Sequence, residues 1–282
     1  MVVVALGLVL RNQVKVYLNR RARAEAQATE AKNREALFQM LQPVALANCE
    51  LQRFGEPHDG GYLMCANLLR EVQSGYSYGI AGYDKWGCDI SRGLGISVHQ
   101  YDCFNTTRPE CAEGQMVFHE ECVGAVARTH EGRAFDTIAN QLAKNGDAGR
   151  RIVLKIDVEG AEWESFAQTP DATLAQIDQM AVEFHDVKDS RIRGVVEKLK
   201  RHFHVAHIHF NNFSCVADLQ PFPSWAYEVL FVSKRLGVIN PNGKAGGVHP
   251  LDAPNNPKSP DCQPTSRDVK PEIARVPDGA LP

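Results

Sequence analysis

Short apolar runs alternate with longer amphipathic stretches through the middle of this chain. The apolar runs are rich in β-branched and aromatic residues and predict seven strands, at residues 75–80, 95–102, 116–122, 151–157, 179–186, 203–210 and 227–233. The stretches between them predict helices at residues 84–94, 132–145, 159–168 and 189–202. Strands separated by helices indicate a mostly parallel sheet with helices on both faces. The fold class that follows is α/β, with a Rossmann-like, seven-stranded sheet.

Both ends of the chain differ from this middle region. The first ten residues are apolar, and residues 12–42 are rich in Ala, Glu, Gln, Lys and Arg and predict one long polar helix. A membrane-spanning helix needs ~20 apolar residues, so the short run fits the end of an anchor, an interfacial foot or an ordinary helix start. The last stretch is dense in Pro, Asn, Gly and Asp and predicts a disordered tail. Three regions result: 1–44, 45–236 and 237–282.

Composition narrows the classes of partner and site. The 282 residues carry a formal net charge of -3, without the basic surplus of proteins that neutralise phosphates, so no nucleic-acid partner is expected. The eight cysteines form no CxxC pair, which argues against a structural zinc site. We interpret most of them as small buried hydrophobic residues, although Cys103, Cys111 and Cys122 are close enough in sequence for disulfides. Membrane-associated and cytoplasmic locations both stay open.

The first two predicted strands end in residues that suit a nucleotide-like cofactor. Gly79, Ala81 and Gly82 follow the first strand, where small residues let the backbone approach a ligand before the next helix. Asp102 ends the second strand about 20 residues later, where an acid accepts hydrogen bonds from both ribose hydroxyls. The two features together predict an adenosine-containing cofactor, and NAD fits them as well.

The fourth predicted strand runs into a cluster of carboxylates. Asp157, Glu159 and Glu162 lie within six residues, directly after a buried apolar run. Like charges this close repel one another, so some must be paired, protonated or bound to a cation. We expect Glu159 to favour the first turn of the next helix through the helix dipole. Asp157 is expected to face the ligand pocket.

Further titratable side chains end the fifth and sixth predicted strands. Alternation places Glu183 and His185 on one face of the fifth strand, and His207 and His209 on one face of the sixth. In doubly wound sheets, ligands bind beyond the carboxyl ends of the strands. We therefore expect Glu183, His185 and His209 to converge with Asp157 on one pocket.

These segments together resemble a known family. The string LKIDVEGAEWESF at 154–166, followed by VEFHD and HIHFNNF, resembles the FkbM-type methyltransferases. Residues 53–55, 59–62 and 78–82 are similar to the related methyltransferase-like proteins of animals and other eukaryotes. The match runs from about Cys49 to Lys234. It implies a class I methyltransferase domain with an antiparallel last strand, S-adenosylmethionine as methyl donor, and O-methylation of a small-molecule or glycan hydroxyl.

The resemblance also implies roles for individual residues. The positions that would bind the cofactor are Asp59, Gly60, Gly61, Tyr62, Gly79, Ala81, Gly82, Asp102 and Asp157. One departure concerns Ser77, which stands where methyltransferases of this class usually carry an acid. The contact to the amino group of the cofactor is then expected from Asp59 or Asp84.

Methyl transfer to a hydroxyl needs a group that takes up the hydroxyl proton, either a base or a metal-bound species. His185 is the expected general base because an imidazole titrates near neutral pH, with Asp157 and His209 as further catalytic residues. Asp157, Glu183 and His209 are also an expected ligand set for Mg²⁺ or Mn²⁺. Two alternatives stay open: a nicotinamide-dependent oxidoreductase, and a non-catalytic, membrane-anchored binding protein that retains the fold, which the serine at position 77 favours.

Overall fold

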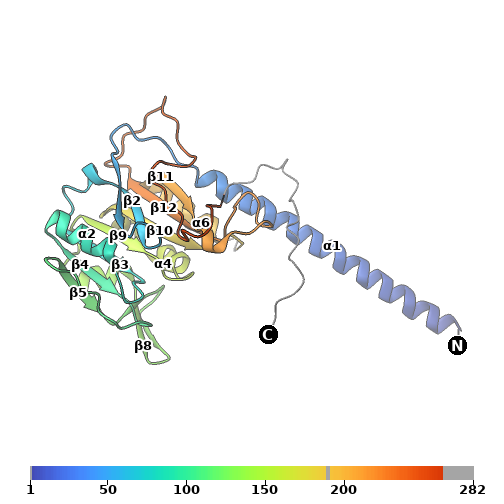
Figure 1. Cartoon of the computed structure of the whole chain (residues 1–282). Coiled ribbons are helices and arrows are strands. Elements are labelled where there is room, and N and C mark those ends of the chain that lie inside the picture. Colours follow the sequence, from blue (N-terminus) through green and yellow to red (C-terminus); the bar gives the residue numbers. More distant parts are fainter. Residues whose placement is uncertain (1, 189–190, 263–282) are drawn as a thin grey trace.

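A seven-stranded sheet forms the centre of the computed structural model, which describes residues 2–188 and 191–262 (Figure 1). Six strands are parallel, and β12 alone is antiparallel to its neighbours in the order β11-β12-β10-β9-β3-β4-β5. The α/β fold with a Rossmann-like, mostly parallel sheet is therefore confirmed, including all seven strands expected from the apolar runs. The strands are β3 (Ser74–Tyr78), β4 (Ser97–Tyr101), β5 (Gln115–His119), β9 (Ile152–Ile156), β10 (Ile177–His185), β11 (Phe203–Phe210) and β12 (Ala226–Ser233).

Helices cover both faces of this sheet. α4 (Glu162–Gln168) and α6 (Ile192–His202) pack on one face, and α2 (Lys85–Leu94) packs on the other. α3 (Ile138–Lys144) contributes to the same apolar cluster as α4 and α6, and the short α5 (Asp171–Leu174) precedes β10. α3 begins later than expected, because the residues before it form a short strand instead. Each face of the sheet thus has its own apolar cluster.

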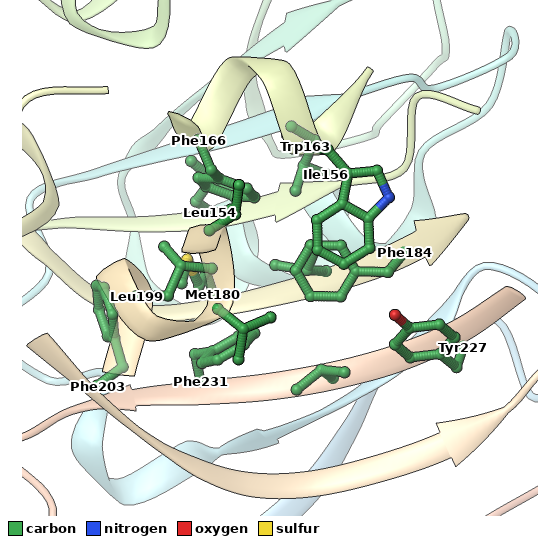
Figure 2. Packing of buried hydrophobic residues seen from close by; sticks show 14 of the residues in the cluster. Leu154, Ile156, Trp163, Phe166, Met180, Phe184, Leu199, Phe203, Tyr227 and Phe231 are labelled. Atoms are coloured by element: carbon green, nitrogen blue, oxygen red, sulfur yellow. The ribbon is translucent and has the colours of Figure 1, made fainter. Parts of the chain in front are cut away.

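The larger apolar cluster lies between the sheet and helices α4 and α6 (Figure 2). Phe184 of β10 stacks on Trp163 of α4, with ring centroids 4.1 Å apart and an interplanar angle of 10°. Side chains alternate along a strand, so burying Phe184 on this face turns Glu183 and His185 toward the opposite face. The packing of the core therefore determines which side chains of β10 reach the candidate site.

Two small sheets that the sequence did not predict flank the strand ends. They are a hairpin of β1 (Leu51–Gly55) and β2 (Gly61–Cys65), and a three-stranded sheet of β6 (Cys122–Val123), β7 (Arg128–His130) and β8 (Arg133–Asp136). Strands this short carry too few residues for a periodic pattern. Both sheets nevertheless contribute side chains at or beside the candidate site.

The N-terminal helix α1 (Val2–Met40) projects from the domain as a long rod (Figure 1). Its last turns pack against the domain: Leu37 and the following Leu41 are buried in the core, and this end contacts α6. The expected long helix is confirmed, and it extends further toward the N-terminus than residue 12. Within the described ranges, no helix is both long and apolar enough to cross a membrane.

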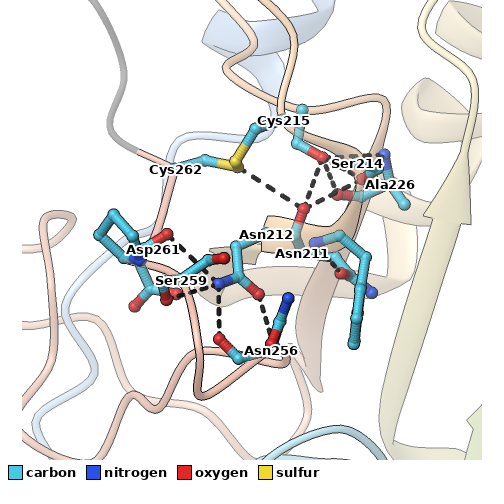
Figure 3. The surroundings of a disulfide bond; sticks show 12 residues. Asn211, Asn212, Ser214, Cys215, Ala226, Asn256, Ser259, Asp261 and Cys262 are labelled. Carbon is cyan, nitrogen blue, oxygen red and sulfur yellow. Dashed lines mark hydrogen bonds between the residues drawn. A yellow bond between two sulfur atoms is a disulfide. The ribbon is translucent and has the colours of Figure 1, made fainter. Parts of the chain in front are cut away.

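The C-terminal region departs from the expected disordered tail. Residues 237–262 pack against the domain, where Cys262 forms a disulfide with Cys215 (Figure 3). The Asn212 amide donates to the Asn256 carbonyl at 3.0 Å and accepts from the Asn256 N–H at 2.6 Å. The tail prediction is therefore wrong for residues 237–262, because composition reports neither a disulfide nor individual hydrogen bonds. The remainder of the expected tail lies outside the described residues.

All eight cysteines form disulfides, so the interpretation of most of them as small buried hydrophobic residues is wrong. The pairs are Cys49–Cys65, Cys88–Cys111, Cys103–Cys122 and Cys215–Cys262. The disulfide between Cys103 and Cys122 joins the loop after β4 to β6. It therefore connects the large sheet to the small three-stranded sheet beside it.

Candidate functional site

The turn after β3 lies against the end of β9. Gly79 has a φ of 71°, and a Cβ at this position would lie 1.7 Å from the Asp157 carbonyl oxygen, so glycine is required here. The buried Lys155 ammonium donates to the Gly79 carbonyl at 2.8 Å and lies 3.7 Å from the Asp157 carboxylate. The glycine turn and Asp157 are therefore held together by backbone contact and by one shared cation.

A cavity of about 380 Å³ lies beside this turn. Val123 of β6 and Phe135 of β8 give it an apolar wall. Small-molecule sites are concave and mostly apolar, with a few polar groups that fix the orientation of the ligand. Four residues that were expected to bind a cofactor line this cavity: Gly79, Ala81, Asp102 and Asp157.

The Asp102 carboxylate organises the loops around this cavity. It accepts hydrogen bonds of 2.8 to 2.9 Å from the backbone N–H groups of Ala81, Phe104 and Asn105. These bonds join the turn after β3 to the loop after β4, and they leave Asp102 only 7% exposed. Asp102 therefore shapes the cavity in addition to lining it.

The other residues expected to bind the cofactor do not line this cavity. They are Gly82 and the residues of the β1–β2 turn and the start of β2, Asp59, Gly60, Gly61 and Tyr62. Asp59 accepts a hydrogen bond from Asn255 at 3.0 Å. The buried Tyr62 hydroxyl lies 3.4 Å from the Glu183 carboxylate and 3.5 Å from Asp157. The hairpin thus supports the ends of β9 and β10 from one side.

Ser77, which stands where an acid was expected, does not reach the cavity. Ser77 is fully buried in β3. Asp84 caps α2, accepting from the Gly87 N–H at 2.8 Å and from the Gln100 amide at 3.0 Å, and burial raises its pKa. The Asp84 carboxylate therefore has protein partners of its own and does not line the cavity.

His185 ends β10 and is held in place at two points. Its Nδ1 lies 3.1 Å from the Glu162 carboxylate at the start of α4. Glu162 is fully buried and also accepts from the N–H groups of Val158 and Gly160. The Trp163 indole N–H donates to the His185 carbonyl. These contacts fix the imidazole and leave Nε2 as its reactive nitrogen.

The Nε2 of His185 faces two further carboxylates. Glu159 lies 3.5 Å away and Asp157 lies 3.8 Å away. One ligand atom from each of these three residues lies within 4.8 Å of the others. Glu159 lies before α4, whose first turn carries Glu162 and Glu164, so the expectation that Glu159 serves the helix start is wrong. Glu162 has that role, and Glu159 belongs to the cluster.

The charge state of His185 follows from these neighbours. Burial by itself would lower the pKa of His185, but the hydrogen bond to Glu162 and the negative charges of Glu162, Glu183 and Asp157 raise it to about 9. With this pKa the imidazole is protonated at neutral pH. A positive charge placed beside it would lower this pKa, because like charges disfavour the protonated form.

A second, larger cavity of about 640 Å³ lies next to His185. It shares Glu159 and Ala161 with the first cavity. Its walls also include Trp163 and Trp225. No pattern in the sequence marks Trp225 as a site residue, because it lies in the irregular segment between β11 and β12. The two cavities therefore meet at the cluster of Asp157, Glu159 and His185.

Glu183 lies beneath this cluster and lines neither cavity. Its carboxylate accepts from Tyr62 and from the Asn211 amide at 2.7 Å, and it lies 4.0 Å from Nε2 of His185. Burial, followed by the charges of Asp157 and Glu228, raises its pKa well above the usual value. Glu183 thus contributes a buried carboxylate next to His185 without facing either cavity.

His209 does not join this site, which corrects the expected convergence. It lies on β11, three strand positions from β9, the strand that Asp157 follows, a separation of about 14 Å at the usual strand spacing. Its Nδ1 lies 3.3 Å from Glu228 and its Nε2 lies 3.4 Å from Asp261. The expected metal set of Asp157, Glu183 and His209 is therefore not assembled. His207 is likewise paired elsewhere, with Asp252 at 2.8 Å.

Comparison with known proteins gives little guidance. No family model matches the chain, and no curated protein sequence matches it. Among solved structures, it is similar to an rRNA methylase from Streptococcus thermophilus, with a TM-score of 0.37 and 9% identity over 60% of this chain and 90% of that chain. A likeness this weak carries no conclusion about this site. The chemistry of the site therefore rests on its own geometry.

Proposed function

We propose that this chain is an S-adenosylmethionine-dependent methyltransferase of the FkbM type, which methylates a hydroxyl of a small-molecule or glycan acceptor. The observation that carries the proposal is the meeting of two cavities at Asp157, Glu159 and His185. Direct group transfer requires a donor and an acceptor held side by side in a fixed orientation. Two adjoining cavities with a base between them meet that requirement.

The first cavity suits the donor. Val123 and Phe135 offer apolar surface for an adenine ring, and Asp102 offers a carboxylate for ribose hydroxyls. Asp157 lines the same cavity and places a negative charge where the positive sulfonium group would lie. When bound, S-adenosylmethionine supplies the activated methyl group.

The role of His185 in this proposal is to take the proton of the acceptor hydroxyl at Nε2. Glu162 holds Nδ1, as a third group orients the base in other nucleophile–base pairs. With a pKa of about 9, His185 has to lose its own proton first. The positive charge of the bound donor favours that loss.

A divalent cation is a second role for the same cluster. Two carboxylates and one imidazole, from Asp157, Glu159 and His185, suit Mg²⁺ or Mn²⁺ better than zinc. Such an ion would polarise the acceptor hydroxyl. It would also compete with the proton for Nε2 of His185, so the two roles are alternatives.

The disulfides indicate where the protein works. Several disulfides in one domain are typical of proteins in secretory and extracellular compartments and are rare in the reducing cytosol. Since this domain has four, we propose that it acts in an oxidising compartment and meets its acceptor there.

Calorimetric titration of the oxidised, purified protein with S-adenosylmethionine, S-adenosylhomocysteine and NAD tests the donor. We expect both adenosyl compounds to bind and NAD to give no heat. Binding of NAD alone would support a nicotinamide-dependent oxidoreductase, and no binding at all would support a non-catalytic protein. An acceptor screen read as S-adenosylhomocysteine release then tests the reaction, in which His185→Gln should retain binding and lose turnover.

A further inference from the structure

We propose that the second cavity binds the acceptor as a sugar ring, with Trp225 as the surface on which the ring stacks. This inference rests on the proposed methyl transfer and names the acceptor of that same site. The cavity, of about 640 Å³, has room for more than one ring and lies against His185. Its walls combine an exposed aromatic face with carboxylates, the two groups that a pyranose needs.

Trp225 is held at a fixed position relative to the base. Its carbonyl accepts from the Asp186 N–H at 2.9 Å, and its N–H donates to the Ser214 carbonyl at 3.3 Å. The ring centroids of Trp225 and His185 lie 5.9 Å apart at 46°. Trp225 is nevertheless 42% exposed, although burial of an aromatic side chain stabilises a protein. A flat apolar face that is held open beside the base suits the C–H face of a sugar.

Carboxylates lie on the same walls as Trp225. Asp186 and Asp218 both line the cavity. Asp186 has a φ of 76° and uses Oδ1 to accept from the N–H groups of Val187 and Lys188. Ionised carboxylates only accept hydrogen bonds, so they select for ligands that donate, as sugar hydroxyls do. An apolar alcohol would offer these carboxylates only its single hydroxyl.

The position of the aromatic face beside His185 also limits which hydroxyl reacts. A ring stacked on Trp225 presents its equatorial hydroxyls at its rim, and one of them would meet Nε2 of His185. The proton of that hydroxyl passes to Nε2 while its oxygen gains the methyl group that leaves the sulfonium. Trp225 is thus a specificity-determining residue, and Asp186 and Asp218 set the orientation of the ring.

Saturation-transfer NMR with a panel of methyl pyranosides tests this inference on the oxidised protein saturated with S-adenosylhomocysteine. We expect at least one pyranoside to bind, with the strongest saturation on the C–H protons of one ring face. Trp225→Ala should weaken its affinity at least tenfold, and Trp225→Phe should recover part of the loss. Phe213→Ala is the matched control, because Phe213 is 63% exposed but does not line the cavity.

The outcomes separate this inference from the proposed function. Unchanged pyranoside affinity in Trp225→Ala, or no binding by any pyranoside, would overturn the sugar assignment even if S-adenosylhomocysteine binds normally. Tetramethylammonium is included as a second probe, because an aromatic face near carboxylates also suits a quaternary amine. Trp225-dependent binding of that probe alone would overturn the sugar in favour of a cationic acceptor. Failure of S-adenosylhomocysteine to bind the wild type would instead reject the donor.

Discussion

The Nδ1 of His185 lies 3.1 Å from the carboxylate of Glu162, which has no exposed surface at all. Glu162 is held in turn by the N–H groups of Val158 and Gly160. The loop between β9 and α4 therefore orients the imidazole through one buried carboxylate. The consequence is that the direction of Nε2, and the pKa of His185, both depend on a residue that lines neither cavity.

The first prediction concerns Glu162→Gln, which keeps the shape of the side chain and removes its charge. The pKa of His185 should fall below about 9, because a hydrogen-bonded negative charge is lost. The midpoint of the rise of kcat/KM with pH should therefore move to lower pH. Loss of the orienting group should also reduce the plateau ~10-fold or more. Glu197→Gln is the control, since its side chain is 56% exposed and lines neither cavity. A pH profile of Glu162→Gln identical to that of the wild type would contradict the assignment.

Glu162, and not Glu159, serves the start of α4, for a reason that the sequence does not contain. The spacing of Asp157, Glu159 and Glu162 along the chain was sufficient to predict a carboxylate cluster, because it depends only on neighbouring residues. Which carboxylate turns inward depends on backbone angles, and Glu159 adopts a φ of 54° that no pattern reports. The fold was predictable because strands and helices bury their residues with a regular period that is visible in the sequence. The backbone path of a loop leaves no such period.

His209 illustrates a second limit of the sequence. Its position at a strand end was predicted correctly, but the sequence does not give the order of strands in the sheet. With β12 inserted between β10 and β11, the row Glu183, Glu228 and His209 extends away from the reaction centre. The C-terminal segment, which was expected to be disordered, supplies Asp261 as the other partner of His209.

The second prediction follows from the raised pKa of His209. Burial by itself would lower it, but the hydrogen bond and charge of Glu228, with Asp252 and Asp261, raise the pKa to about 9. The unfolded value is about 6.5, so the folded state binds this proton more tightly. The stabilisation is fully present below pH 6.5 and is lost as the pH rises through about 9. Chemical denaturation between pH 6 and 9.5 should therefore show stability falling, and His209→Gln should flatten the slope.

The third prediction concerns the disulfide that holds the C-terminal segment. Replacing Cys215 and Cys262 together by serine releases a loop closed over a sequence separation of 47 residues. The chain-entropy model gives about 4 kcal/mol of lost stability for a loop of this length. The Cys49–Cys65 disulfide closes a loop over a sequence separation of only 16 residues. Replacing both of its cysteines by serine should therefore cost about 1 kcal/mol less stability than replacing Cys215 and Cys262. Equal stability of the Cys215 and Cys262 double variant and the wild type in urea would show that the segment contributes little.

The fourth prediction concerns Asp102 and the donor cavity. Asp102→Ala removes the acceptor of three backbone N–H groups as well as a wall of the cavity. Affinity for S-adenosylhomocysteine should therefore fall at least tenfold, with a lower melting temperature because the N–H groups lose their partner. Asp102→Asn retains one side-chain oxygen and should recover part of the melting temperature. Calorimetry and thermal denaturation measure the two effects separately, and unchanged affinity in Asp102→Ala would remove this cavity as the donor site.

The last prediction distinguishes the two roles proposed for the cluster of Asp157, Glu159 and His185. If it holds a divalent cation, Mn²⁺ should bind the protein in an electron-spin-resonance titration, and Glu159→Gln should weaken that binding because one of two carboxylate ligands is lost. Binding should also tighten as the pH rises toward 9, because the metal needs the neutral imidazole. Chelation should then abolish turnover, and added Mg²⁺ or Mn²⁺ should restore it. If His185 acts as a base alone, turnover should survive chelation while His185→Gln lowers it ~10²- to 10⁴-fold. Glu197→Gln serves again as the control, since its exposed side chain undergoes the same charge change and lines neither cavity.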